Sequence, residues 1–370
     1  MIAENDSRIV LTLDAGGTNF VFSAIQANQE IVTPVRLAAE TKVLDRCLEV
    51  IESGFRKVMD QLDQQPVAIS FAFPGPADYP NGIIGKLNNL PAFSGGVALG
   101  PFLEERFGLP TFINNDGNLF VYGEAISGLL PQVNQLLEQA GSPKRYRNLF
   151  GVTLGTGFGG GLVINDELVL GDNSNAGEVW LLRNKVRPEC FAEEGAGIRA
   201  VRGAYARQLG IAIDDAPTPE EIAAIATEAN GEEQSAAIAA FAELGEVVGD
   251  ALANGSTLID GLIVIGGGIS NAHSIFMQSL IDEMNSTLAT YDGGEVHRIV
   301  QKVFNLESPE ERKLFAAGET KTISVPGSER TISYDPLQRI GIGVSTLGTS
   351  RAVSIGAYAF ALNKIDETKS

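Results

Sequence analysis

The sequence predicts an α/β protein with two lobes that face a shared cleft, and two observations lead to this prediction. Apolar runs of strand length alternate with amphipathic stretches of helix length, a pattern typical of α/β folds. A strand, a glycine-rich turn and a second strand occur at residues 8–25 and again at residues 151–164. Two such hairpins in a chain of 370 residues, which is long enough for two cores, indicate two similar lobes that each contribute one turn to the cleft.

The first hairpin bends at two adjacent glycines, Gly16 and Gly17. Glycine has no Cβ and adopts positive φ readily, so this turn can present bare backbone N–H groups that suit a phosphate. Asp14 ends the first strand, where its carboxylate can hold a hydrated Mg²⁺, and Thr18 adds a hydroxyl group. An ordinary hairpin turn is the alternative, because Gly-Gly is common between strands.

The second hairpin favours the phosphate site over the ordinary turn. It repeats the pattern of strand, glycine turn and strand, with Gly155 in the place of Asp14, so only the first copy carries the carboxylate. A third glycine run, Gly266-Gly267-Gly268, follows another buried strand and precedes a helix expected to begin near Ser270. Three such turns in this order indicate a nucleotide-binding protein more strongly than any one of them.

We expect the N-terminal lobe to cover residues 1–118 and to be joined by a C-terminal helix at 351–370. Cys47 lies on the apolar face of its first helix and is predicted to be a packed core thiol. The run Phe73-Pro74-Gly75-Pro76 forces a sharp turn after a buried strand. Along the lobe the predicted elements are a strand at 30–37, a helix at 41–61, a strand at 66–73 and a helix at 99–107.

A loop with two asparagines, Asn88 and Asn89, ends in Phe93. An asparagine side chain both donates and accepts hydrogen bonds, so this loop can contact a sugar or polyol. A surface turn explains the same residues equally well, and both interpretations stay open.

The short strand at 110–113 leads into Asn114-Asn115-Asp116-Gly117-Asn118 and then into a helix starting at 119–125. Asp116 can act as a general base for a hydroxyl group that Asn115 positions. It can also be a simple helix N-cap, a position that aspartate favours. The junction also lies at the expected lobe boundary, where clefts form, and both interpretations of Asp116 stay open on these residues alone.

We expect the C-terminal lobe over residues 119–350. Glu178 follows a loop of small residues and is a candidate acceptor for substrate hydroxyls, while Trp180 is assigned to the core rather than to a sugar-stacking face. In the last helix, Gly356 lies on a face of small residues that allows close helix packing. The predicted elements are helices at 189–209, 217–227, 234–253 and 272–284, a strand at 261–265 and, in a possible insertion at 295–340, a helix at 309–316 and polar strands at 321–334.

Composition excludes several classes of protein. The net charge of −19 argues against a nucleic-acid partner, because phosphate backbones bind basic surfaces. Two cysteines and two histidines make a disulfide framework impossible and zinc unexpected. The polar, acidic N-terminus does not fit a signal peptide, and no apolar run reaches transmembrane length, so we expect a cytoplasmic protein without a membrane partner.

These motifs together resemble the ROK family of sugar kinases and repressors, within the actin/hexokinase/Hsp70 ATPase superfamily, over most of residues 8–364. The glycine turns resemble two phosphate motifs and an adenosine motif, and Pro74-Gly75-Pro76, Asn89-Leu90-Pro91 and Asn115-Asp116-Gly117-Asn118 resemble blocks around the family's sugar site. The resemblance implies a ribonuclease H-like (actin-like ATPase) fold, ATP and Mg²⁺ as cofactors, a small-molecule sugar as substrate, and a homodimer.

The resemblance also assigns site residues. Asp116 is the catalytic base, and the implied sugar-binding residues are Asn89, Asn115, Glu178 and Glu193. Asp14 is associated with Mg²⁺ through water. The implied nucleotide-binding residues are Asp14, Gly16, Gly17, Thr18, Asn19, Gly155, Thr156, Gly157, Gly266, Gly267 and Gly268.

The chain departs from the family's pattern in two places. The usual Gly-Glu-x-Gly-His run is Gly177-Glu178-Val179-Trp180-Leu181 here, so the sugar-binding histidine is absent. The usual zinc-binding cysteine cluster is absent too, with Cys190 alone nearby, and Glu193 is a candidate sugar contact from the segment that follows it. These departures leave the identity of the substrate open more than the chemistry.

The sequence therefore predicts ATP-dependent phosphorylation of a hexose or amino-hexose hydroxyl by a glucokinase-like enzyme. A sugar-sensing or regulatory protein with weak or no turnover is the alternative, supported by the missing histidine and cysteines. A kinase for another polyol, or one that uses another phosphoryl donor, is a third possibility. The first hairpin starts at Arg8, so we expect no DNA-binding segment before it.

Overall fold

The structure is a computed structural model that describes residues 6–16, 18–87, 90–228 and 230–369. The chain divides into two compact units. Unit 1 comprises Met1–Gly128, Asp166–Ala176 and Leu347–Ser370, and unit 2 comprises Leu129–Asn165 and Gly177–Thr346. We describe each unit by itself.

A mixed sheet with the strand order β3-β2-β1-β5-β9 forms the centre of unit 1. β1 pairs antiparallel with β2 through the first glycine turn and parallel with β5, which in turn pairs parallel with β9. The strands are β1 (Val10–Ala15), β2 (Asn19–Gln26), β3 (Gln29–Glu30), β4 (Val35–Ala38), which pairs with β2, β5 (Ala68–Ala72) and β9 (Thr111–Asn114). A small sheet of β6 (Ala77–Asp78), β7 (Ile83–Lys86) and β8 (Ser94–Ala98) follows β5, and β12 (Glu167–Leu168) also belongs to this unit.

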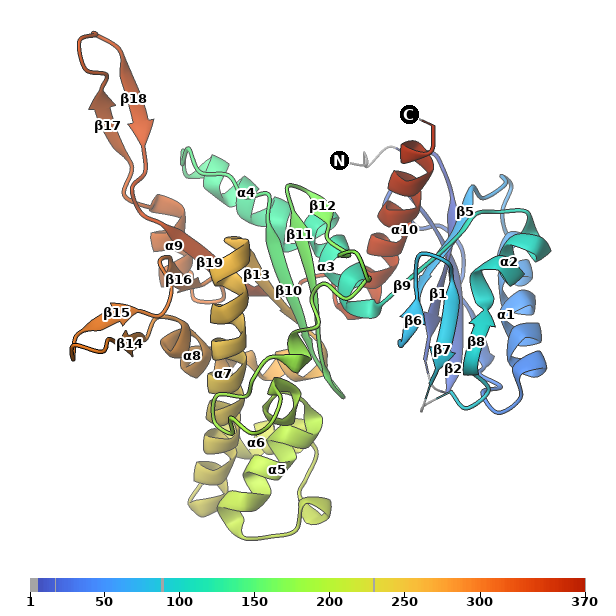
Figure 1. Cartoon of the computed structure of the whole chain (residues 1–370), viewed down its shortest axis with the longest axis horizontal. Coiled ribbons are helices and arrows are strands. Elements are labelled where there is room, and N and C mark those ends of the chain that lie inside the picture. Colours follow the sequence, from blue (N-terminus) through green and yellow to red (C-terminus); the bar gives the residue numbers. More distant parts are fainter. Residues whose placement is uncertain (1–5, 17, 88–89, 229, 370) are drawn as a thin grey trace. The chain divides into compact units, whose positions relative to one another are not determined.

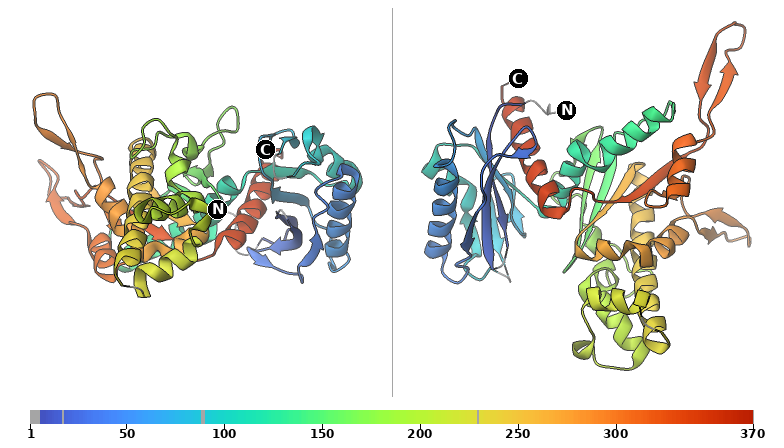
Figure 2. Two further views of the ribbon diagram at one scale, coloured as in Figure 1. Left: turned by 90° about the horizontal axis from the view of Figure 1, so that it is seen from below. Right: turned by 180° about the vertical axis from the view of Figure 1, so that it is seen from behind.

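Alternating residues of β1 bury both faces of this sheet. Leu11 and Leu13 pack with Phe22 and with Phe55 of α1 (Leu44–Met59), while Val10 packs on the opposite face against α10 (Thr349–Glu367). Both faces are therefore apolar, and helices cover each of them (Figures 1 and 2). The remaining helices are α2 (Leu99–Phe107) and α3 (Asp116–Ser127).

The backbones of α3 and α10 touch where they cross. A Cβ added to Gly356 would lie 1.9 Å from the carbonyl oxygen of Leu119, and one added to Gly123 would lie 1.9 Å from that of Ala352. The small-residue face predicted around Gly356 thus packs against the helix that starts at Asp116.

We expect Gly356→Ala to lower the free energy of unfolding by ~1–3 kcal/mol, because the added methyl group can only be accommodated by moving a backbone. Thermal and urea unfolding measure the effect. Gly203→Ala in α5 (Ile198–Leu209) is the matched control, since its Cβ would have its nearest neighbour at 3.4 Å, and an equal loss of stability in both variants would contradict the prediction.

Unit 2 is built on a second mixed sheet that repeats the plan of the first. Its hairpin, β10 (Leu149–Leu154) with β11 (Phe158–Ile164), pairs along β10 with β13 (Leu262–Gly266) in parallel. Parallel strands β19 (Arg339–Val344) and β16 (Lys302–Asn305) complete the order β11-β10-β13-β19-β16. The repeated hairpin seen in the sequence therefore corresponds to two sheets of like topology.

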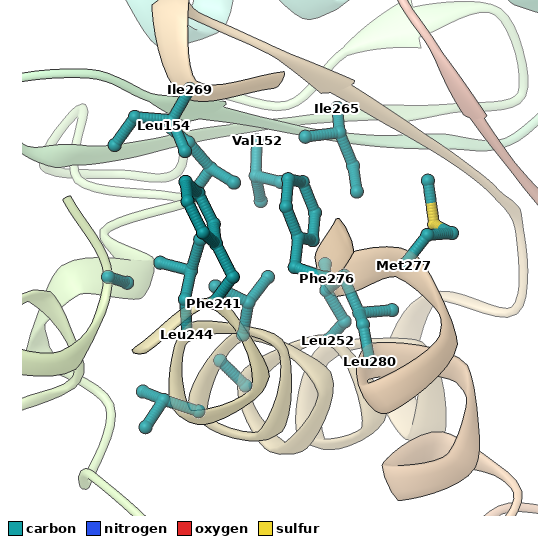
Figure 3. Packing of buried hydrophobic residues seen from close by; sticks show 14 of the residues in the cluster. Val152, Leu154, Phe241, Leu244, Leu252, Ile265, Ile269, Phe276, Met277 and Leu280 are labelled. Atoms are coloured by element: carbon teal, nitrogen blue, oxygen red, sulfur yellow. The ribbon is translucent and has the colours of Figure 1, made fainter. Parts of the chain in front are cut away.

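Long helices cover the second sheet. Phe241 and Leu244 of α7 (Glu232–Ile259) and Phe276 of α8 (His273–Met284) point at Val152 and Ile265 of the sheet (Figure 3). The other helices of the unit are α4 (Leu129–Gln139), α5 (Ile198–Leu209), α6 (Pro219–Glu228) and α9 (Pro309–Ala317). Two hairpins, β14 (Thr287–Ala289) with β15 (Glu295–His297) and β17 (Lys321–Ser324) with β18 (Thr331–Tyr334), project from the unit (Figure 1).

Three sequence-based element predictions need correction. The strand predicted at 30–37 is split into β3 and β4, and Pro34, which has no N–H for a ladder, lies between them. The helix predicted at 189–209 starts at Ile198, because Ala192 N–H bonds to Leu182 O and draws the preceding residues into a loop. Within 295–340, β16 and the start of β19 are strands of the main sheet.

Among the described residues, none of the helices is both long and apolar enough to cross a bilayer.

Candidate functional site

The register of unit 1 brings its candidate residues to one edge of the sheet. Asp14 pairs with Ala72, and Ala72 pairs with Asn114, so the carboxyl ends of β1, β5 and β9 are level. Neighbouring strands are ~4.8 Å apart, which places the backbones of Asp14 and Asn114 roughly 10 Å from each other. In open α/β sheets this edge is where ligands bind.

The first glycine turn lies at this edge and is tightly closed. A Cβ on Gly16 would come within 2.9 Å of the carbonyl oxygen of Asn19, which explains the requirement for glycine there. Asp14 is exposed, and its Oδ2 accepts a hydrogen bond of 3.3 Å from the hydroxyl of Ser350 at the start of α10. Thr18 is exposed beside them, while Gly17 lies outside the described residues.

Asp116 is the first residue of α3, and its carboxylate is exposed. The N-cap of the helix is Asn115, whose Oδ1 accepts the Asn118 N–H at 2.6 Å. The interpretation of Asp116 as the N-cap is therefore wrong, because the side-chain amide of Asn115 caps the helix. Asp116 Oδ1 accepts only a local bond of 2.9 Å from the N–H of Gly117, among the bonds of the described residues.

Two buried asparagines support this turn from behind. Asn114 Oδ1 accepts the N–H of Asn115 at 2.9 Å and the side-chain amide of Asn118 at 3.1 Å. They hold the backbone on both sides of Asp116. This supporting role was not predicted, although the repeated asparagines of this segment are a visible sequence signal for it. Asn89, predicted to contact sugar, lies outside the described residues.

The second and third glycine turns meet in unit 2. Thr153 pairs with Gly266, so β10 and β13 end level at the carboxyl edge of the sheet. Gly267 has a φ of 88°, and a Cβ there would lie 2.3 Å from the carbonyl oxygen of Leu154. Only glycine permits this approach, which brings Gly267 against the end of β10, with Gly268 and Gly155 lining the same cavity.

A cavity of about 470 Å³ opens where these two turns meet, with Gly155 and Gly268 in its lining. Phe241 and Ile269 give it apolar walls, and its polar side chains are Thr218, Glu220 and Asn271. The described residues that line it include no lysine or arginine. Such a slot suits a flat, uncharged ring system, and any phosphate bound beside it would rest on backbone N–H groups. Residues that are far apart in the sequence line the cavity, so no local sequence pattern predicted it.

Both candidate acids of unit 2 have hydrogen-bond donors within the protein. Glu178 Oε2 accepts the indole N–H of Trp180, and Glu193 Oε2 accepts the N–H of Phe158 at 2.8 Å. The second contact ties Glu193 to the glycine turn, since a Cβ on Gly157 would meet the same oxygen at 2.4 Å. Trp180 packs in part against the core, as predicted, with its polar edge turned to Glu178.

The segment between these acids does not offer a zinc site. Structural zinc takes four nitrogen or sulfur ligands, whereas Cys190 is the single thiol here, and the described residues form no group of three or more side chains placed to hold a metal. Buried Asn184 organises the segment instead. Its Oδ1 accepts the N–H groups of Val186 and Arg187, both at 2.9 Å, and its backbone N–H bonds to Cys190 O at 3.1 Å.

Two α/β sheets, each with an antiparallel hairpin followed by parallel strands and a glycine turn at the carboxyl edge, define a protein of the actin-like ATPase fold. The model of the ROK family matches residues 10–309. The chain therefore belongs to the ROK family, as the motifs predicted.

Known relatives differ in the sugars they are named for. A glucokinase from Parabacteroides distasonis is 54% identical, with 98% of this chain and 99% of that chain covered and a TM-score of 0.89. An N-acetyl-D-glucosamine kinase of Vibrio cholerae is 32% identical over 170 residues, which span 46% of this chain and 51%, about half, of that enzyme. A ROK family glucokinase from Streptomyces griseus in complex with glucose and AMPPNP shares the fold at 17% identity and a TM-score of 0.59, over 95% of this chain and 98% of that one.

Proposed function

We propose that this protein phosphorylates a hexose, with ATP as the phosphoryl donor. The observation that carries the proposal is the cavity of unit 2, where the second and third glycine turns meet beside an apolar slot. A purine fits the slot, and the turns offer backbone N–H groups to the phosphates. The AMPPNP complex of the Streptomyces griseus relative supports ATP as the donor.

Glucose is the proposed first substrate. The Parabacteroides distasonis glucokinase is similar along the full chain, and it supports glucose over N-acetylglucosamine. The Vibrio cholerae N-acetyl-D-glucosamine kinase, which matches over about half its length, makes the amino-hexose the second candidate.

In the proposed reaction, Asp116 accepts the proton of the sugar hydroxyl while that oxygen attacks the γ-phosphorus of ATP, and the bond to the ADP oxygen breaks. The Oδ1 of Asn115 accepts the hydrogen bond that caps the helix, so the side-chain N–H₂ group of Asn115 positions the hydroxyl. Glu178 and Glu193 accept hydrogen bonds from other hydroxyls, each through the oxygen that receives no hydrogen bond from the described residues.

The backbone N–H groups of Gly155, Thr156 and Gly157 would meet the charge on the phosphates. Mg²⁺ would neutralise phosphate charge, and the exposed carboxylate of Asp14 fits a water-mediated contact with it. Ser350 holds that carboxylate in place.

We further propose that the protein acts as a homodimer in the cytoplasm. Gel filtration with light scattering measures the molar mass in solution and tests the dimer.

An ADP-release assay over a panel of sugars tests the proposed function. We expect turnover with glucose, a lower kcat/KM with N-acetylglucosamine, and no ADP release without a sugar. Sugar binding without ADP release would replace the kinase with the sugar-sensing alternative. Turnover restricted to non-sugar polyols would instead refute the hexose assignment.

A further inference from the structure

Trp180, the single tryptophan of the chain, touches a proposed sugar-binding acid. Its indole N–H donates to Glu178 Oε2. Its ring meets that of Phe191 edge to face, with centroids 5.7 Å apart and planes at 85°. The donor is therefore fixed by a second aromatic ring from the far side of the loop.

The backbone leaves Glu178 little freedom on its other side. Gly177 has a φ of 85°, and a Cβ there would lie 3.1 Å from the Cα of Gly161 on β11. Val179 packs on the same strand, where its side chain lies 2.7 Å from the position of a Cβ on Gly160. The acid thus projects from a turn that is closely packed against the sheet.

Hydrogen bonds within the protein close the loop that carries Phe191. Asn184 is 2% exposed and bonds to three backbone groups of the loop, and its Nδ2 lies 2.7 Å from where a Cβ on Gly195 would be. The N–H of Ala192 bonds to Leu182 O at 2.7 Å and completes the closure. An asparagine amide and backbone bonds therefore hold the segment in shape.

We propose that Trp180 is a positioning residue for substrate binding: its N–H holds Glu178 in the orientation that accepts a sugar hydroxyl, on a loop closed by Asn184 instead of a metal ion. This inference rests on the proposed function, in which Glu178 binds the sugar. A hydrogen bond to one carboxylate oxygen fixes the group in a single rotamer, and among the described residues the other oxygen, Oε1, receives no hydrogen bond. Pre-organisation of this kind improves binding because less freedom is lost on association.

Trp180→Phe tests the donor, because it keeps an aromatic ring and removes the N–H. We expect the KM for the sugar to rise about tenfold, which corresponds to ~1.4 kcal/mol, with the KM for ATP unchanged and kcat within a few-fold. Phe191→Leu is the control that removes the edge-to-face contact and keeps the N–H, and its sugar KM should rise less than that of Trp180→Phe. Equal sugar KM values for wild type and Trp180→Phe would overturn the proposal.

A double-mutant cycle with Glu178→Gln separates positioning from a general loss of structure. If Trp180 acts through Glu178, adding Trp180→Phe to Glu178→Gln changes sugar affinity little, so the two effects do not add. Additive effects would mean that Trp180 acts elsewhere and would reject the inference. Melting temperatures of all variants identify any that do not fold, and the response of Trp180 emission to glucose in the wild-type protein then still tests the contact.

Two readouts do not depend on turnover. The emission of Trp180 should shift on titration with glucose, and calorimetry should show weaker glucose binding by Trp180→Phe. Wild-type protein that binds glucose and releases no ADP would refute the kinase and leave this inference standing, whereas a fully active kinase indifferent to Trp180→Phe would refute the inference alone. Dialysis against a metal chelator should leave glucose binding unchanged, and a loss of binding that zinc restores would overturn the metal-free closure.

Discussion

Asp116→Asn is expected to lower kcat by about 10²–10⁴-fold, the range typical of a lost general base. The amide keeps the size of the side chain and cannot accept the proton of the hydroxyl. Its effect on folding should be small, because Asn115 and not Asp116 caps α3. ADP release at saturating ATP and sugar measures kcat, and urea unfolding checks stability.

The chain offers a matched control for this variant. Asp45 is also an acidic residue in the first turn of a helix, at the start of α1. Asp45→Asn removes the same favourable interaction with the helix dipole, worth ~0.3–1 kcal/mol, away from Asp116. It should leave kcat unchanged, and an Asp116→Asn protein as active as this control would remove Asp116 from the mechanism.

Asp335→Asn is expected to destabilise unit 2 by ~3–5 kcal/mol, because it leaves a buried guanidinium without its counter-charge. Arg339 is 1% exposed at the start of β19, and its Nη1 lies 2.6 Å from Asp335 Oδ2. Arg339 Nε donates to the carbonyl oxygen of Phe315 at 2.7 Å, which fixes the guanidinium under α9. Against a total stability of roughly 5–15 kcal/mol for a typical protein, this loss is large.

Tryptophan emission during urea unfolding measures the effect, since Trp180 lies in unit 2. Glu246→Gln is the control in the same unit, because it breaks an ion pair with Lys185 whose side chains are 45% and 37% exposed. Exposed pairs contribute ~0–1 kcal/mol. A loss for Asp335→Asn no greater than for Glu246→Gln would show that the buried pair does not stabilise the unit.

The same pair should make unit 2 sensitive to acid. Burial by itself raises the pKa of Asp335, but the hydrogen bond from Arg339 and the N–H groups of Glu319 and Leu337 outweigh it and lower the pKa below the ordinary 3.8. A lowered pKa in the folded state gives stability that is complete above the ordinary value and is lost as the pH falls through the folded value. Wild-type unit 2 should therefore lose stability below about pH 4 more steeply than the Asp335→Asn variant.

Some structural features were not predictable from local patterns. Residues 295–340 show only weak secondary-structure patterns and many polar side chains. Nevertheless, β16 lies in the main sheet, and β19 lies between β16 and β13. The partners of β19 lie 37 or more residues away in sequence, with Lys302 of β16 paired to Arg339 and Ile263 of β13 paired to Ile342. A parallel strand forms its hydrogen bonds with strands that are distant in the sequence, so its own residues predict little about its position in the sheet.

The sequence by itself determined the three glycine turns, the acids at the carboxyl ends of β1 and β9, and the family, because each is a local pattern of strand, turn and side chain. Tertiary structure alone decided that Phe158 donates to Glu193, 35 residues away in the sequence, and that two turns and distant helices enclose one cavity. The physical reason is range. Strand and turn propensities act between neighbours in the chain, whereas a hydrogen bond such as that between Glu193 and Phe158 exists only after the whole unit has folded.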